Sequence, residues 1–178
     1  MTVDVQAEAI NDFYRTVAMN RLYYFTRLRV LRRWCTFTDL VIAIGSSSAV
    51  AAWAIWRAGG TAASVWQVIA GAATLIAIAK PFLRLGDEVQ RYAELVTGYT
   101  SVYFEAEVIV QTAKRMNGVS DALWQSFEQS EERMRKLGLN DDPRAEPRLL
   151  QESFDEVNRR MPASDLWWPN SGQIHNVA

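Results

Sequence analysis

The chain has very few residues of the kinds that build cross-links and metal centres. Its 178 residues include one cysteine, Cys35, and one histidine, His175. A single cysteine cannot form a disulfide within the chain, and one cysteine with one histidine cannot supply a Cys/His zinc site. We therefore expect neither a disulfide framework nor a bound metal.

The sequence also lacks a strong net charge and the short motifs of common enzymes. The 19 basic and 20 acidic residues leave a formal charge of −1, so bulk charge does not support nucleic-acid binding. A glycine-rich phosphate loop, a nucleophile elbow and a metal-binding helix motif are all missing from the sequence. We therefore expect no enzymatic activity, no catalytic residues and no cofactor.

Charge is nearly absent from one central block of the chain. Residues 34–79 contain only Asp39 and Arg57 as charged residues, whereas both flanks are rich in charge. Arg57 divides this block into runs of 23 and 22 residues, and a membrane-spanning helix needs about 20 apolar residues. The block therefore predicts two transmembrane helices. The alternative is a soluble bundle that buries one helical hairpin.

The flanks of this block predict how the chain would lie in a membrane. Six arginines precede it, and Lys80, Arg84 and Arg91 follow it, whereas the predicted loop is next to Arg57 alone. Because basic flanks stay on the cytoplasmic side, we expect both termini to be cytoplasmic.

The predicted fold is all-α: an integral membrane protein with a two-helix transmembrane hairpin and a cytoplasmic helical bundle. The N-terminal helix, a long helix after the second span and C-terminal helices would form that bundle. The predicted elements are an N-terminal amphipathic helix (1–33), two spans (34–57 and 62–80) around an external loop (58–61), a long helix (81–116), C-terminal helices (120–161) and a tail (162–178).

The long helix carries apolar residues at alternating spacings of four and three. This heptad pattern predicts a seam that packs in a bundle or an oligomer. The three tyrosines of the seam are interpreted as bundle core, and the alternative is a surface on which a nucleotide base stacks. The seam begins with Leu85, Val89, Tyr92, Val96, Tyr99 and Tyr103. A parallel row, which widens the apolar face, consists of Leu95, Val102, Ile109 and Met116.

Local signals mark the C-terminal helices. Ser120 is suited to cap a helix that stops at Gly138. Pro147 is suited to the first position of another helix, whose inward residues are expected to be Leu150, Phe154, Val157 and Met161. In the tail, Trp167 and Trp168 are expected to dock on the bundle, on a partner or on a membrane.

The predicted hairpin contains a few small or polar residues that suggest helix packing or a polar path. They are Asp39, Ser46, Ser47, Gln67, Gly71 and Thr74. For Asp39 the alternatives are an ion pair with Lys80 and a charged ring at a pore mouth. For Gln67 and Thr74 they are hydrogen bonds within or between helices and the lining of a water-filled path, which would require several copies of the hairpin.

The layout resembles the SLATT family, the two-transmembrane effector domains associated with bacterial nucleotide-signalling defence genes. The resemblance covers roughly residues 10–116, including Arg-Leu-Arg-Val-Leu-Arg-Arg-Trp at 27–34 and Arg-Tyr-Ala-Glu-Leu-Val-Thr-Gly-Tyr at 91–99. It implies a location in the bacterial inner membrane, a homo-oligomer in contact with the lipid bilayer, and a partner protein or nucleotide-signal sensor as trigger.

Three functions follow as hypotheses. The first is an antiviral defence effector that oligomerises and permeabilises the membrane when triggered. The second is a non-conducting, membrane-anchored scaffold that holds a cytoplasmic partner. The third is a constitutive small ion channel.

Overall fold

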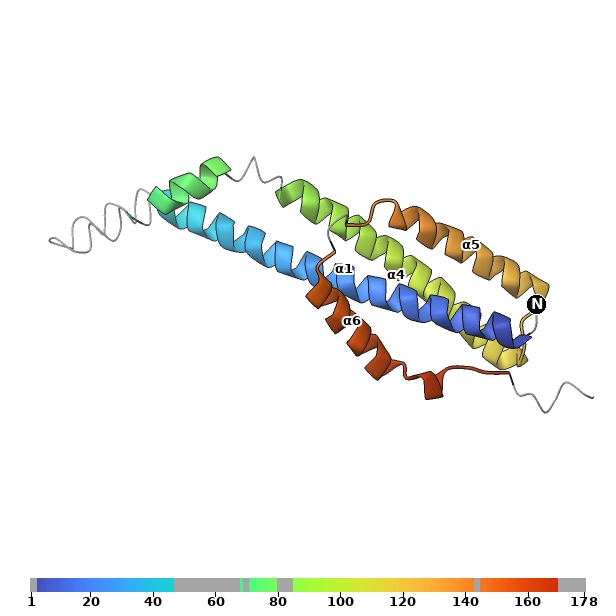
Figure 1. Ribbon diagram of the computed structural model, residues 1–178. Coiled ribbons are helices and arrows are strands. Elements are labelled where there is room, and N and C mark those ends of the chain that lie inside the picture. Colours follow the sequence, from blue (N-terminus) through green and yellow to red (C-terminus); the bar gives the residue numbers. More distant parts are fainter. Residues whose placement is uncertain (1–2, 47–67, 69–70, 80–84, 143–144, 170–178) are drawn as a thin grey trace, which may run out of the picture. The chain divides into compact units, whose positions relative to one another are not determined.

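The described part of the chain consists of helices joined by short turns and loops. The computed structural model describes residues 3–46, 68, 71–79, 85–142 and 145–169 (Figure 1). Its elements are α1 (Val3–Ser46), α4 (Leu85–Met116), α5 (Asp121–Gly138), α6 (Pro147–Arg160) and a short 3-10 helix (Ala163–Asp165), and residues 71–79 are helical as well. No strand occurs within these ranges.

The transmembrane prediction is wrong. No helix among the residues described above combines the length and the hydropathy that crossing a bilayer demands. In α1, Arg32, Arg33 and Asp39 interrupt the apolar sequence before the helix ends at Ser46. This finding overturns the membrane hairpin, the inner-membrane location and the cytoplasmic orientation of both termini. Residues 47–67, 69–70 and 80, which make up much of both predicted spans, lie outside the described residues.

The chain divides into two compact units. The first unit comprises Met1–Thr26 and Ala93–Ala178, and the second comprises Arg27–Tyr92. Helices α1 and α4 each contribute residues to both units. The predicted end of the N-terminal helix at residue 33 does not appear, because α1 continues without a break to Ser46.

In the first unit, α4 runs antiparallel to α1, and α5 returns along α4 (Figure 1). Large apolar side chains from these helices and from the tail form one core, as amphipathic helices require. The core consists of Ala7, Ile10, Phe13, Val17, Val102, Ala106, Ile109, Val110, Ala113, Leu123, Phe127 and Trp167. Helix α6 lies against α1, where the Arg15 guanidinium donates a hydrogen bond to the Asn158 side chain.

A tight turn brings α5 back along α4. Asn117 adopts a positive φ of 49°, a conformation that asparagine tolerates better than most residues. The Gly118 and Asn117 N–H groups donate to the carbonyls of Ala113 and Lys114, 3.1 and 3.4 Å away, which is the Schellman pattern. Ser120 then caps α5, because its hydroxyl accepts the Leu123 N–H. This cap confirms the sequence prediction.

Gly98 allows α4 and α5 to approach closely. A Cβ atom at this position would lie 2.5 Å from Cδ2 of Leu137 and 3.1 Å from its Cδ1. A side chain at position 98 would therefore force the end of α5 outward or Leu137 into another rotamer.

Helix α6 begins as predicted but faces another way. Pro147 occupies its first turn, which confirms the prediction of a proline start. Leu150 and Phe154 are exposed, however, and the buried residues are Ser153 and Val157. The predicted inward face is therefore wrong for Leu150 and Phe154.

Candidate functional site

A groove lies between α4 and α5 in the first unit. It has a volume of about 550 Å3, and its apolar wall is built by Phe104, Val108 and Ile109 of α4. Phe104 is 54% exposed and Val108 is 64% exposed. The remaining lining is polar and comes from Ser101, Glu105, Ser126, Gln129, Ser130 and Arg133. An exposed apolar pair within a polar rim is typical of a protein-binding surface.

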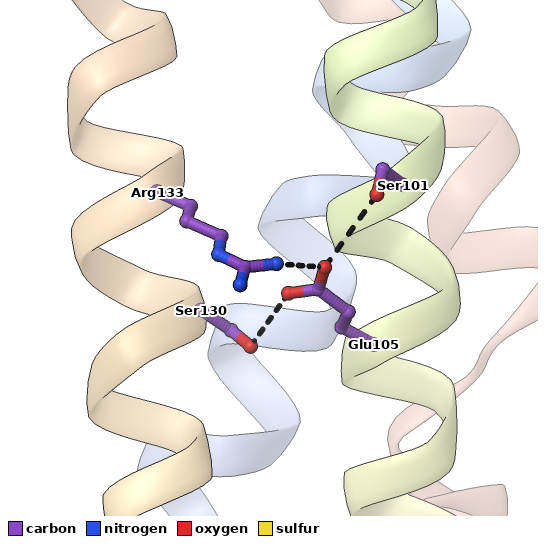
Figure 2. A network of polar contacts seen from close by, with 4 residues as sticks. All are labelled: Ser101, Glu105, Ser130 and Arg133. Carbon is purple, nitrogen blue, oxygen red and sulfur yellow. Dashed lines mark hydrogen bonds and ion pairs between the residues drawn. The ribbon is translucent and has the colours of Figure 1, made fainter.

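A polar network ties the two walls of this groove together (Figure 2). The Glu105 carboxylate of α4 forms an ion pair with Arg133 of α5. The Ser130 hydroxyl donates to the same carboxylate at 3.0 Å, and the Ser101 hydroxyl donates to it at 3.5 Å. Glu105 is thus neutralised by a partner on the opposite wall, and the network leaves the apolar wall free to bind.

An aromatic stack supports the edge of α4 behind the groove. The ring of Tyr14 stacks on that of Tyr103 at 5.2 Å between centroids, and the two hydroxyls share a hydrogen bond of 3.0 Å. The Arg21 guanidinium lies 4.7 Å from the Tyr103 ring centroid and 5.8 Å from that of Phe104. Burial raises the pKa of the Tyr14 hydroxyl above its ordinary range. The Arg21 side chain thus lies near the rings of both Tyr103 and Phe104.

Three tyrosines hold the connection between α5 and α6. The Tyr99 hydroxyl donates to the Asp141 carboxylate at 2.8 Å. The Tyr24 hydroxyl accepts the N–H of Asp142 at 3.3 Å, and the Tyr23 hydroxyl accepts the N–H of Glu146 at 3.1 Å. The rings of Tyr24 and Tyr99 are stacked at 5.3 Å. We call this set of side chains the tyrosine clamp.

The tyrosine clamp predicts a loss of stability at alkaline pH. Burial, reinforced by Asp141, raises the pKa of Tyr99, and burial also raises that of Tyr24. Above the unfolded-state pKa of about 10, the unfolded chain loses these protons while the folded chain keeps them. The free energy of unfolding therefore falls as pH rises beyond that point, by up to about 1.4 kcal/mol per pH unit for Tyr99.

Urea denaturation at several pH values between about 8 and 11 measures this slope. Tyr99→Phe removes one titrating hydroxyl, so its slope is expected to be shallower than that of the natural chain. Equal slopes for the two proteins would refute the assignment to Tyr99.

The tail is anchored to the bundle by one of its two tryptophans. Trp167 is buried in the core, and its carbonyl accepts a hydrogen bond of 2.8 Å from the Asn11 side chain. Trp168 next to it is 47% exposed. The sequence left the bundle, a partner and a membrane open as docking sites, and the structure places Trp167 on the bundle.

The predicted seam of α4 faces the interior of the bundle over most of its length. In the first unit Tyr99 is buried, and Val96 and Tyr103 are partly buried. In the second unit Tyr92 is buried, and Leu85 and Val89 are partly buried. There the Arg27 guanidinium donates to the Tyr92 hydroxyl at 3.4 Å. The parallel row Leu95, Val102 and Ile109 is also buried, whereas Met116 is exposed.

The structure describes four of the six residues predicted for helix packing or a polar path, so that assignment stays a prediction. Asp39 is an exposed residue of α1, Ser46 ends that helix, and Gly71 and Thr74 are exposed positions of the helical segment 71–79. Ser47, Gln67 and Lys80 lie outside the described residues. Among the described residues of the second unit, an apolar pocket of about 470 Å3 is lined by Leu31, Trp34, Phe37, Thr38, Ile76, Ala79 and Leu85.

Within the described ranges, His, Cys, Asp and Glu side chains nowhere gather in a group able to hold a metal ion. Sequence reasoning missed the groove because it treated only the apolar seam of α4 and the parallel row beside it. The available signal was the pair Phe104 and Val108, four residues apart, outside that seam.

Searches against protein-family models, curated proteins and solved structures found no match for this chain.

Proposed function

We propose that the chain is a non-enzymatic scaffold whose first unit binds a helix of a protein partner in the groove between α4 and α5. The observation that carries the proposal is the exposure of Phe104 and Val108, both more than half accessible, on a helix whose opposite face packs into the core. Large apolar side chains that stay exposed side by side on a folded domain mark interaction surfaces.

The shape of the groove favours a helical partner. Its apolar wall follows the axis of α4, and its polar rim follows α5, so that an amphipathic helix laid lengthwise would contact both. Ser126 and Gln129 on the rim are suited to hydrogen bonds with the polar edge of such a helix. The Glu105–Arg133 pair stiffens the groove and limits the ordering that binding requires.

Pore formation and constitutive channel activity are not proposed, because both require the transmembrane spans that were overturned above. The defence role implied by the SLATT resemblance stays a prediction. Of the hypotheses drawn from the sequence, the scaffold is retained without its membrane anchor.

A site-specific photo-crosslinker tests the proposal. A benzoyl-phenylalanine residue replaces Phe104 in the full chain, and cells that make this protein are irradiated. We expect one adduct of defined mass, with the partner peptide identified by mass spectrometry. Adding Val108→Lys to the same chain should abolish the adduct, because a charged ammonium replaces an exposed apolar side chain in the middle of the wall.

Phe154 supplies a matched control, since it is a phenylalanine of similar exposure, 48%, on the α6 helix. The same crosslinker at position 154 is expected to give no adduct of that mass. Equal adducts at both positions, or none at position 104, would show that the groove is not the binding surface.

A further inference from the structure

An exposed row of residues runs along the outer side of α4 in the first unit. Its members are spaced three and four residues apart in strict alternation, which places them on one line along the helix. Every one of them is exposed, so the row is separate from the buried seam. The row consists of Glu94, Thr97, Ser101, Phe104, Val108, Gln111 and Arg115.

Charge is distributed unevenly along this row. An acidic residue, Glu94, lies at one end, the apolar pair lies in the middle, and Arg115 lies at the other end beside Lys114. If two such rows met in parallel, like charges would face each other at both ends. If they met antiparallel, the acidic end of each would lie near the basic end of the other.

The antiparallel arrangement also fixes a register. If a two-fold axis lies midway between Phe104 and Val108, Phe104 of each copy faces Val108 of the other copy. Ser101 then lies opposite Gln111 of the second copy. Glu94 is offset from Arg115 of the second copy by three residues, or about 4.5 Å along the helix, which is within reach of an ion pair.

Two acidic residues, Glu105 and Glu107, lie one position to either side of this axis, and like charges there oppose such a contact. Glu105 lies beside Phe104 and would approach Glu105 of the second copy across the axis. Its carboxylate is already paired with Arg133 and accepts hydrogen bonds from Ser130 and Ser101. The network of Figure 2 therefore weakens the repulsion that Glu105 contributes between two copies.

We propose that the partner held by the groove is a second copy of this chain, bound through an antiparallel contact between the two exposed rows of α4. The inference rests on the proposed scaffold function and names its partner. A two-fold contact uses the same patch on both copies, so the patch must be complementary to itself. The row meets this requirement because its residues run from acidic through apolar to basic.

The first test is the molar mass of the full chain in solution, measured by light scattering over a concentration series. The expected value rises to twice the chain mass of 20.2 kDa. Phe104→Glu should shift the protein to the monomer mass while its far-ultraviolet circular dichroism stays unchanged. Phe154→Glu, the matched control on α6, should leave the dimer intact. A natural chain that stays monomeric throughout overturns the inference.

The second test measures the register with engineered cysteines in a Cys35→Ser background. Ser101→Cys with Gln111→Cys should give a disulfide-linked dimer, because these positions face each other across the axis. The two positions are ten residues, or about 15 Å, apart within one helix, too far for an internal disulfide. Ser101→Cys alone should stay monomeric. A dimer formed by Ser101→Cys alone would indicate a parallel contact and overturn the inference.

The two proposals fail in different ways. A monomer whose position 104 crosslinks to another protein overturns the second-copy inference and leaves the scaffold function standing. A monomer that gives no crosslink at position 104 overturns both.

Discussion

Trp167→Ala is expected to lower the free energy of unfolding by about 3–5 kcal/mol. The indole of Trp167 is only 7% exposed and belongs to the core formed by α1, α4 and α5. Alanine leaves a cavity there and removes the apolar contact that holds the tail. The buried Asn11 side chain then also loses the fixed carbonyl to which it donates.

Trp168 is the matched control, because the two tryptophans are adjacent and differ in burial. Trp168→Ala is expected to change the free energy of unfolding by no more than about 0.5 kcal/mol. Urea denaturation followed by circular dichroism measures both variants. If the two substitutions had equal effects, Trp167 would not be part of the core.

Phe127→Ala is the second substitution for which we expect a large effect, a loss of about 3–5 kcal/mol in the free energy of unfolding. The Phe127 ring meets that of Phe13 edge to face at 5.3 Å between centroids, and it lies 4.7 Å from Trp124. Phe127 thereby joins α5 to α1 through the centre of the bundle. Its removal leaves a cavity that three helices border.

Phe154→Ala provides the comparison, since the same side chain on α6 is about half exposed. We expect its effect to stay within about 0.5 kcal/mol. Because Phe127→Ala loosens α5, its thermal midpoint should fall as well. A small effect of Phe127→Ala in both measurements would contradict the packing described for α5.

Local features of the structure follow directly from neighbouring residues. Ser120 caps α5 through a hydrogen bond to a residue three positions later, and Pro147 opens α6 because it lacks the N–H that a first turn leaves unpaired. Such contacts span a few residues, so the sequence pattern is sufficient to predict them.

The inward face of a short helix is harder to predict. In α6 the spacing favoured Leu150 and Phe154 as core residues, and the structure buries Ser153 and Val157 instead. Arg15 of α1 donates a hydrogen bond to Asn158, so this side of α6 faces the bundle while Leu150 and Phe154 stay exposed. The inward face of α6 therefore depends on residues distant in the sequence.

The low charge of residues 34–79 led to the transmembrane prediction. Hydropathy alone does not show where a helix begins and ends. Helix α1 is one helix from Val3, and its apolar end is continuous with a segment that contains Arg27, Arg29, Arg32 and Arg33. The described residues hold no helix apolar enough over a sufficient length to span a bilayer.

The sequence by itself determined the helical class of the described residues, the apolar faces of α4 and the starts of α5 and α6, because these depend on periodicity and on contacts between near neighbours. Only the tertiary structure decided that Trp167 is core while Trp168 is surface. It also brought Glu105 to Arg133, 28 residues away, and left Phe104 and Val108 uncovered beside that pair. The physical reason is that burial and pairing between distant residues depend on how whole helices pack, and residue spacing does not record this.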